Sequence, residues 1–312
     1  MSSILSEKHF HDEAAAYRFV EARVWANGIT CPHCGNADEA KIGKLKGNST
    51  RIGVHKCYAC REPFTVKVGT IFESSHVPLH LWLQAIFLIA SSKKGISSNQ
   101  LHRTLGVTLK TAWFMSHRIR EAMRMPLEDQ GALGGGGKAV EVDETYVGGK
   151  ESNKPIYKRR NKGSQGKAAV FSMVERGGEV RSMHLAQVTS ANLRPILLAH
   201  VDDKSVIMTD DAGMYRKLGD DFAHEVVNHS AEEYVRGDAH TNTIESYFSI
   251  LKRGINGVYH HISQQHLGRY LAEFDFRYNS RVALGVGDTA RAERIVTSVV
   301  GKRLTYQTTG AR

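Results

Sequence analysis

Hydrophobic residues in the first half of the chain recur with the spacing of helices. The most apolar stretch, Leu79–Ala90, is interrupted by His80 and Gln84 and is shorter than the roughly 18 residues that a membrane span needs, so it predicts a core helix. Serines at 97 and 98 and a threonine at 108 can cap two further helices, separated by a turn at Gly106. The apolar positions of these two helices are Leu101, Leu105, Ala112, Met115 and Ile119. This pattern is typical of a helix-turn-helix.

The second half of the chain alternates between strand-like and helix-like segments. A short strand at 140–142 precedes the acidic pair Asp143-Glu144, and 167–188 predicts a hairpin with its turn at Arg176. A helix at 189–201, a strand at 206–208, a short helix, a strand at 224–230 and a helix at 240–255 follow. This order of elements is that of the RNase H-like fold, an α/β fold with a mixed sheet. We therefore expect the first and fourth strands to be neighbours in that sheet.

Three carboxylates stand where this order brings elements together. Asp143 follows the first strand, Asp210 follows the fourth, and Glu245 lies in the first turn of the last helix. Each has an ordinary explanation by itself, since an aspartate can cap a turn and a glutamate stabilises a helix N-terminus. Neighbours on a strand point to opposite faces, so Glu144 and Asp211 are the alternatives. We favour Asp143 and Asp210 because each directly follows an apolar run.

Such a cluster predicts a site for divalent cations. Crowded like charges are unfavourable unless cations neutralise them, and Mg²⁺ prefers oxygen ligands. Two Mg²⁺ or Mn²⁺ ions at these carboxylates are suited to phosphoryl transfer. Lys252 lies two turns after Glu245 on the same helix face, with Arg253 beside it, so both are candidates to hold a phosphate.

All four cysteines of the chain lie in two C-x-x-C pairs. Cys31 with Cys34 and Cys57 with Cys60 have the spacing of two knuckles that share one tetrahedral Zn²⁺. Disulfides or redox thiols are the alternative, but a cytosolic chain disfavours them. With four thiolates, the zinc has no open position, so its role is structural.

The balance of charge favours a polyanionic partner. The chain has 42 Lys and Arg against 32 Asp and Glu, a formal net charge of +10, and such an excess favours binding to nucleic acid. Seven of these basic residues and one glutamate lie between Lys93 and Arg124. The expected DNA contacts are Lys110, Arg118 and Arg120 in this segment, and Lys158, Arg159 and Arg160 in a basic loop at 150–167. The alternatives are an ordinary helical hairpin with a solvated basic face and a solvated surface insertion.

Several motifs together resemble bacterial insertion-sequence transposases of the DDE class that carry an N-terminal transposase zinc ribbon. They are "CPHCGN", "CYACREPFTVKVGTIFESSHVPLHLWL", "SNQLHRTLGVTLKTAW", "VEVDETYVGGK", "MTDDAGMY" and "HTNTIESYFSILKRGI", and the likeness extends over most of residues 10 to 285. The resemblance implies that Asp143, Asp210 and Glu245 are the catalytic triad and that Lys252 is its basic companion. Some similar proteins have Asn or His at the third position, whereas this chain has Glu.

The resemblance also implies a function and partners. We expect binding to the terminal inverted repeats of an insertion sequence, Mg²⁺-dependent 3′-end cleavage, and strand transfer into target DNA. The expected partner is double-stranded DNA, on which a homodimer or higher oligomer forms, with no membrane involved. No signal-peptide pattern opens the chain, so a cytoplasmic, nucleoid-associated protein is expected. The alternatives are a catalytically inactive zinc-dependent DNA-binding regulator derived from a transposase and a nuclease without strand transfer.

Five segments are expected. They are an N-terminal helix and zinc ribbon at 1–75, a helix-turn-helix region at 76–126, a Gly-rich linker at 127–138, an RNase H-like catalytic domain at 139–285 and a C-terminal tail at 286–312.

Overall fold

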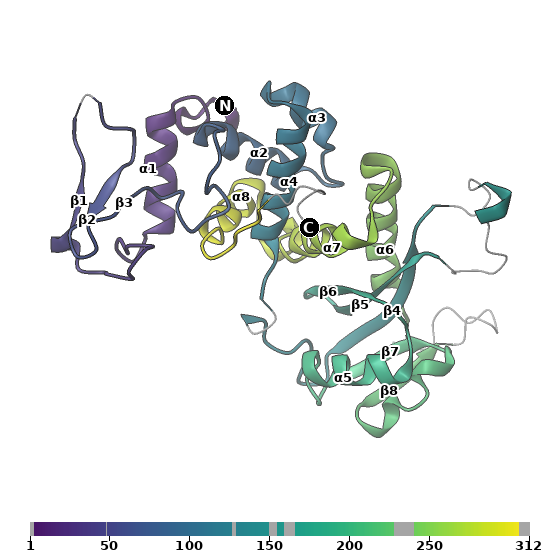
Figure 1. Ribbon diagram of the computed structural model, residues 1–312. Coiled ribbons are helices and arrows are strands. Elements are labelled where there is room, and N and C mark those ends of the chain that lie inside the picture. Colours follow the sequence, from purple (N-terminus) through teal and green to yellow (C-terminus); the bar gives the residue numbers. More distant parts are fainter. Residues whose placement is uncertain are drawn as a thin grey trace. The chain divides into compact units, whose positions relative to one another are not determined.

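The chain forms two compact units. The computed structural model describes residues 3–47, 49–126, 129–149, 155–158, 166–227 and 240–305. Unit 1 comprises Met1–Arg124 and Val286–Arg312, and unit 2 comprises Met125–Gly285 (Figure 1). Within the described residues, no helix is long and apolar enough to cross a membrane.

A small three-stranded sheet lies near the start of unit 1. Its strands are β1 (Ile42–Lys44), β2 (His55–Cys57) and β3 (Pro63–Phe64), which pair antiparallel in that order. Helix α1 (Glu13–Val24) precedes the sheet, and the Asp12 side chain caps it by accepting a hydrogen bond from the Ala15 amide.

Three helices follow the small sheet, as the hydrophobic pattern predicts. They are α2 (Leu79–Ser91), α3 (Ser98–Leu105) and α4 (Leu109–Met123). The Ser97 hydroxyl caps α3 and the Thr108 hydroxyl caps α4. Between the two helices, Gly106 has a left-handed backbone conformation with φ of 66°, which glycine adopts without strain. The predicted core helix and the predicted helix pair are therefore confirmed.

The last residues of the chain also belong to unit 1. The segment at 286–312, which we expected to be a tail, contains helix α8 (Asp288–Thr297). Arg291 of α8 donates to the Ala90 carbonyl of α2 at 2.9 Å, and Ser298 donates to the Ala122 carbonyl of α4 at 2.7 Å. The C-terminal segment therefore closes the helical core of unit 1.

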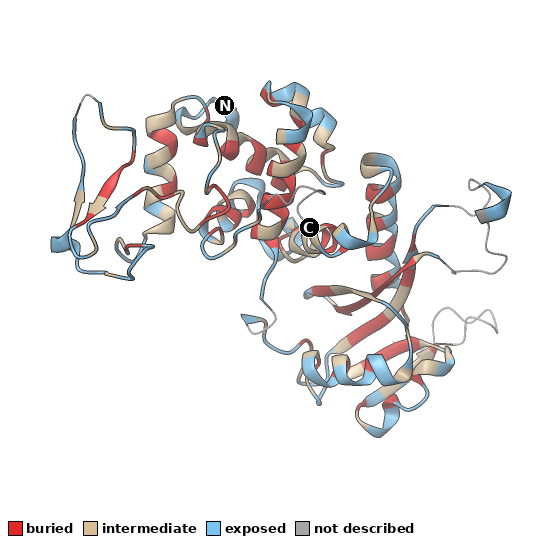
Figure 2. Cartoon of the chain, in the orientation of Figure 1, coloured by how far each residue is buried: buried red, intermediate tan, exposed pale blue. Residues whose placement is uncertain are grey.

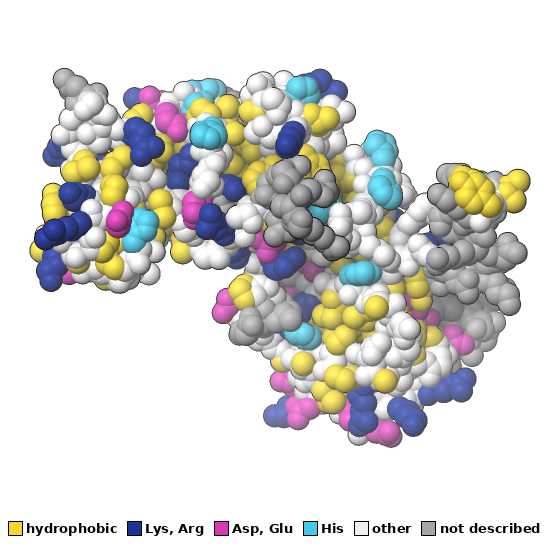
Figure 3. All heavy atoms as spheres, viewed as in Figure 1, with side chains coloured by type: hydrophobic (Ala, Val, Ile, Leu, Met, Phe, Trp, Pro, Cys, Tyr) yellow, Lys and Arg dark blue, Asp and Glu magenta, His cyan; other side chains and the backbone are white. Residues whose placement is uncertain are grey.

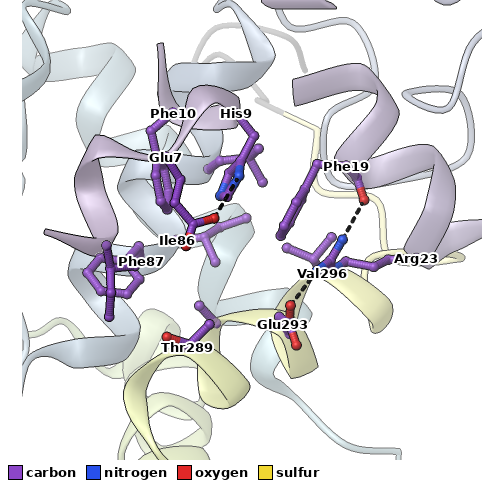
Figure 4. Close-up of a pocket in the computed structure, with 13 residues that line it drawn as sticks. Glu7, His9, Phe10, Phe19, Arg23, Ile86, Phe87, Thr289, Glu293 and Val296 are labelled. Carbon is purple, nitrogen blue, oxygen red and sulfur yellow. Dashed lines mark hydrogen bonds and ion pairs between the residues drawn. The ribbon is translucent and has the colours of Figure 1, made fainter. Parts of the chain in front are cut away.

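A small cavity of about 150 Å³ lies between α1, α2 and α8 (Figure 4). Apolar side chains such as Phe10, Ile86 and Val296 form much of its lining. The charged side chains at its edge are paired, because Arg23 bonds to Glu293 and its guanidinium lies over the Phe19 ring. The cavity is therefore a mostly apolar pocket at the surface of the helical core of unit 1, with the exposed Ile4 and Glu7 in its lining.

Unit 2 is built on a mixed five-stranded sheet in the order β6-β5-β4-β7-β8. β4 (Ala139–Val147) is antiparallel to β5 (Ala168–Glu175), which is antiparallel to β6 (Val180–Leu185). On the other side of β4, β7 (Val206–Asp210) and β8 (Ala223–Val227) run parallel to it. The first and fourth strands of this unit are thus neighbours. This confirms the predicted fold class, a zinc ribbon and helices followed by an RNase H-like domain with a mixed sheet.

Helices cover both faces of this sheet. On one face, α5 (Ser190–His200) packs Leu193 and Leu197 against Val142 of β4 and Ile207 of β7. On the other face, α6 (Asn242–Gly254) and α7 (Gln264–Asn279) pack against Val170 of β5. Buried residues run along the central strands and along α6 in Figure 2. Because of this layering, any side chain of β4 faces either α5 or α6.

The glycine-rich segment differs from the expected linker. Leu133 is buried and forms a bridge with Val201, and the Gly134 amide donates to Glu175 at 2.9 Å. Gly134 has φ of 84°, and a Cβ there would lie 2.1 Å from the Ser205 hydroxyl. The glycines therefore permit a close approach to the edge of unit 2.

Candidate active site and metal centre

Asp143 and Asp210 lie on neighbouring parallel strands. The pairing of β4 with β7 places Val140 opposite Ile207 and Glu141 opposite Met208. Continuing this register by two residues places Asp143 opposite Asp210. Paired residues on adjacent strands share a face, so both carboxylates project from the same side of the sheet.

The shared face is the one that α6 covers. Val140, Val142 and Ile207 pack into the core on the α5 side. Side chains alternate along a strand, so Glu141 and Asp143 project toward α6. We expected Asp143 at the end of its strand, but it lies in the middle of β4. β4 continues to Val147 because its antiparallel pairing with β5 extends past the point where β7 ends at Asp210.

Glu245 comes to this face on the first turn of α6. The helix buries its apolar side, with Ile244, Tyr247, Phe248 and Leu251 inside the core. Glu245 is exposed beside them, and its carboxylate accepts a hydrogen bond from the Thr241 hydroxyl at 3.2 Å. Lys252 and Arg253 are exposed further along the same helix.

A groove of about 720 Å³ lies between β4 and α6. Asp143 and Glu245 line it together with Lys252 and Arg253, so carboxylates and basic side chains face one cavity. A groove with both charges is suited to hold cations and the phosphates that bridge to them.

The electrostatics of Asp143 reflect this crowding. Burial, together with the nearby negative charges of Glu144, Asp210 and Glu245, raises the pKa of its carboxyl from 3.8 to about 7, against a hydrogen bond from the Glu144 amide that lowers it. A bound cation would relieve the repulsion among these groups. The carboxylate oxygens of Asp143, Asp210 and Glu245 are the kind of donor that a hard divalent ion prefers, so the residues present fit such an ion.

Glu144 also lines this groove, but its carboxylate already has a partner. Its carboxylate accepts a hydrogen bond from the buried Tyr215 hydroxyl at 2.7 Å. Tyr215 ends the short turn Gly213–Tyr215 that follows Asp210, so this bond ties the chain after β7 to β4. Burial raises the pKa of Glu144 as well. These contacts favour Asp143 over Glu144 as the carboxylate that faces Glu245.

The four cysteines form the tightest ligand cluster in the described part of the chain. Their sulfur atoms lie within 4.8 Å of one another, and no other set of three or more His, Cys, Asp or Glu side chains among the described residues is that close. Cys31 Sγ lies 3.7 Å from Cys60 Sγ, and Cys34 Sγ lies 3.7 Å from Cys57 Sγ. A tetrahedral ion with metal–sulfur bonds of about 2.3 Å needs sulfurs about 3.8 Å apart. The thiols are free, so the geometry fits zinc and excludes the disulfide alternative in this structure.

Two of the expected DNA contacts lie inside unit 1. Arg118 and Arg120 are only 5% and 1% exposed. Arg118 donates to the carbonyls of Ile71 at 2.8 Å and Glu73 at 2.7 Å, and Arg120 donates to the Ser116 hydroxyl at 3.0 Å. The expectation that they reach DNA is therefore corrected, since both guanidinium groups satisfy acceptors within the fold.

The other basic residues have different positions. Lys110 is exposed in the first turn of α4. Lys158 ends the short turn Ile156–Lys158, and its side chain is outside the described atoms. Arg159 and Arg160 lie outside the described residues.

Sequence reasoning missed one buried acid next to the site. Glu141, two residues before Asp143, is 0% exposed and accepts hydrogen bonds from the backbone of α6. The signal was present in "VEVDE", where an acid stands between two valines of a predicted buried strand. A buried acid requires a partner, but the sequence alone does not identify one.

The fold and the matches to two family models assign two parts of the chain to a class. A four-cysteine ribbon precedes a mixed RNase H-like sheet. Residues 133–279 match the model of the ISXO2-like transposase domain, and residues 11–62 match that of the transposase zinc-ribbon domain. The chain therefore carries an ISXO2-like DDE transposase domain behind a transposase zinc ribbon.

Individual proteins are similar to the chain to different degrees. An "Uncharacterized protein in transposable element ISH50" from Halobacterium salinarum is 29% identical over 283 residues, which cover 86% of this chain and 92% of that protein. The crystal structure of the Mos1 strand transfer complex has 13% sequence identity and a TM-score of 0.29, over 68% of this chain and 72% of that one. The crystal structure of a pre-cleavage Mos1 transpososome has 13% sequence identity and a TM-score of 0.24, over 72% of this chain and 79% of that one.

Proposed function

We propose that the chain is the transposase of a bacterial insertion sequence. It binds the terminal inverted repeats of the element and catalyses 3′-end cleavage and strand transfer, with Asp143, Asp210 and Glu245 as its catalytic carboxylates. The observation that carries this proposal is the register of β4 and β7, which sets Asp143 beside Asp210 on the face that presents Glu245.

The chemistry follows from the groups in the groove. Two Mg²⁺ or Mn²⁺ ions held by the three carboxylates would activate the attacking oxygen and stabilise the leaving one. Asp143 would give up a proton on binding them, because its metal-free carboxyl has a pKa of about 7. Lys252 and Arg253 are suited to bind the phosphates on either side of the scissile bond, which orients the DNA backbone.

DNA binding rests on the other parts of the chain. We propose that the zinc ribbon and the helix pair α3–α4 hold double-stranded DNA, with Lys110 in contact with phosphate. Figure 3 shows Lys and Arg side chains gathered over the ribbon, where Lys44, Lys46 and Arg51 are exposed. Lys158, Arg159 and Arg160, which follow β4 in the sequence, add a basic segment.

The zinc at the four cysteines is structural in this proposal. Four thiolates complete a tetrahedron and leave no position for water or substrate, so the ion stabilises the ribbon. The segments 1–75, 76–126 and 139–285 serve as ribbon, helical DNA-binding region and catalytic domain. The segment 127–138 leads into the catalytic domain, and its Leu133 and Gly134 pack at the edge of that domain. We also propose that a homodimer or higher oligomer assembles on DNA in the cytoplasm, associated with the nucleoid.

A cleavage assay tests the function. The full chain is incubated with Mg²⁺, a labelled duplex that carries the end of its own element, and a plasmid target. The proposal predicts a nick that frees the 3′-OH of the end, followed by joining of that end to the plasmid. Binding without cutting would identify an inactive DNA-binding regulator, and cutting without joining would identify a nuclease.

A further inference from the structure

The N-terminus of α6 is capped from the sheet. The Glu141 carboxylate accepts hydrogen bonds from the backbone amides of Thr243 at 2.8 Å and Ile244 at 2.9 Å, and from the Thr243 hydroxyl at 2.8 Å. The first amides of a helix have no partner within it, so a cap must come from elsewhere. The residue at the usual capping position, Thr241, makes no such bond and donates to Glu245 instead.

The same carboxylate is paired with an arginine, and a histidine lies beside it. Arg176 Nε lies 2.6 Å from Glu141 Oε1, and His240 Nδ1 lies 3.2 Å from it. Arg176 also donates to the His240 carbonyl at 2.8 Å. The hairpin turn after β5, the strand β4 and the segment that enters α6 are thus joined through one buried carboxylate.

This network is adjacent to the candidate active site. Glu141 and Asp143 are two residues apart on one face of β4, and Ile244 and Glu245 are consecutive in α6. The cap therefore fixes where the first turn of α6 lies along β4, the strand that carries Asp143, and how that turn is rotated about the helix axis. A negative charge at a helix N-terminus is also favourable to the helix dipole.

We propose that Glu141 is a positioning residue, which fixes the first turn of α6, and with it the Glu245 carboxylate, relative to Asp143 so that both can bind divalent cations. The proposal rests on the function proposed above. Supporting partners of metal ligands typically contribute about 10-fold to 100-fold in metal affinity. We therefore expect Glu141→Gln to weaken Mg²⁺ binding to the full chain, with its zinc bound and Mg²⁺ removed, by roughly tenfold or more, as titration calorimetry measures.

A second readout needs no metal. Hydrogen exchange of the α6 amides in the metal-free protein should be faster at Thr243 and Ile244 in Glu141→Gln by about tenfold, because a bond to a charged acceptor is weakened. Amides in the second half of α6 and in β5 should keep their protection. Binding to the end duplex should be unchanged, since it rests on other residues.

Glu273→Gln is the matched control. Glu273 is also 0% exposed and ion-paired, with Arg277, and accepts from the Tyr259 hydroxyl at 2.6 Å. The control should lower the stability of unit 2 without a change in Mg²⁺ affinity. Equal Mg²⁺ affinity in wild type, Glu141→Gln and Glu273→Gln would overturn the proposal.

A double variant addresses the charge left by the substitution. Glu141→Gln leaves the partly buried Arg176 without its anion, so Glu141→Gln with Arg176→Met restores charge balance without restoring an anionic cap. The weakened Mg²⁺ affinity should persist in this double variant. A return to wild-type affinity, or failure of both variants to fold, would mean that Glu141 serves folding alone. Wild-type protein that neither binds Mg²⁺ nor cuts DNA would instead refute the proposed function.

Discussion

Asp143→Asn should stabilise the metal-free catalytic domain while it removes the response to Mg²⁺. The substitution keeps the size of the side chain and an oxygen that can accept from the Glu144 amide. In the folded protein the Asp143 carboxyl has a pKa of about 7 instead of 3.8. A tenfold change in a protonation constant corresponds to about 1.4 kcal/mol, so ionised Asp143 costs up to about 4 kcal/mol. Because the side chain is partly exposed, we expect the free-energy cost of ionising Asp143 in the folded protein to be roughly 2–4 kcal/mol.

The sign of the pH dependence follows from the raised pKa. Near pH 4 the carboxyl is protonated in the folded chain and close to half protonated in the unfolded chain, so the variant and wild type should differ little in stability. As the pH rises toward 7, wild type should lose stability relative to the variant, and above 7 the difference should be constant. Millimolar Mg²⁺ should stabilise wild type at pH 8 but not the variant.

The two units can be followed separately. All three tryptophans, Trp25, Trp82 and Trp113, lie in unit 1, so their fluorescence during denaturation is an internal control that should not respond to the substitution. Hydrogen exchange of the β4, β5 and β7 amides, compared between variant and wild type at each pH, measures the stability of unit 2. Equal protection of the two proteins at pH 8, or a difference that persists at pH 4, would refute the reasoning.

Three further substitutions test other parts of the chain. Cys57→Ser should release zinc, whose binding supplies on the order of 10 kcal/mol, and unfold the ribbon while hydrogen exchange in unit 2 is unchanged. Metal analysis that finds no zinc in freshly reduced wild type would contradict the zinc assignment. Lys110→Ala should lower the salt slope of end binding by about one unit without loss of stability. Arg118→Met should destabilise unit 1 by roughly 2–4 kcal/mol and leave the salt slope of end binding unchanged. A lower salt slope with unchanged stability would instead place Arg118 at the DNA interface.

Features set by local chemistry could be predicted from the sequence. The caps at Ser97, Thr108 and Thr189 involve bonds to amides a few residues away, so the residue type and its position suffice. The order of strands and helices in unit 2 likewise follows from hydrophobic periodicity, and it places Asp143 and Asp210 on neighbouring strands.

Features that depend on distant partners could not be predicted. The sequence of a helix with an excess of basic residues does not show which of them face the core. Arg118 can be buried because its guanidinium donates to the carbonyls of Ile71 and Glu73, which lie 47 and 45 residues away in the sequence. The C-terminal helix α8 has no local signal for its partner α2. The role of Glu141 depends on the α6 amides, which lie 102 and 103 residues further along the chain.

Mg²⁺-dependent cleavage of the element's own end, measured across a set of single variants, tests the central claim most directly. Asp143→Asn, Asp210→Asn and Glu245→Gln should each reduce cutting by orders of magnitude and leave end binding intact or tighter, because the carboxylates hold the metal ions. Asp211→Asn is the neighbouring control and should cut as wild type does. Wild-type cutting by Asp143→Asn, or loss of cutting in Asp211→Asn with Asp210→Asn still active, would contradict the assignment of the active site.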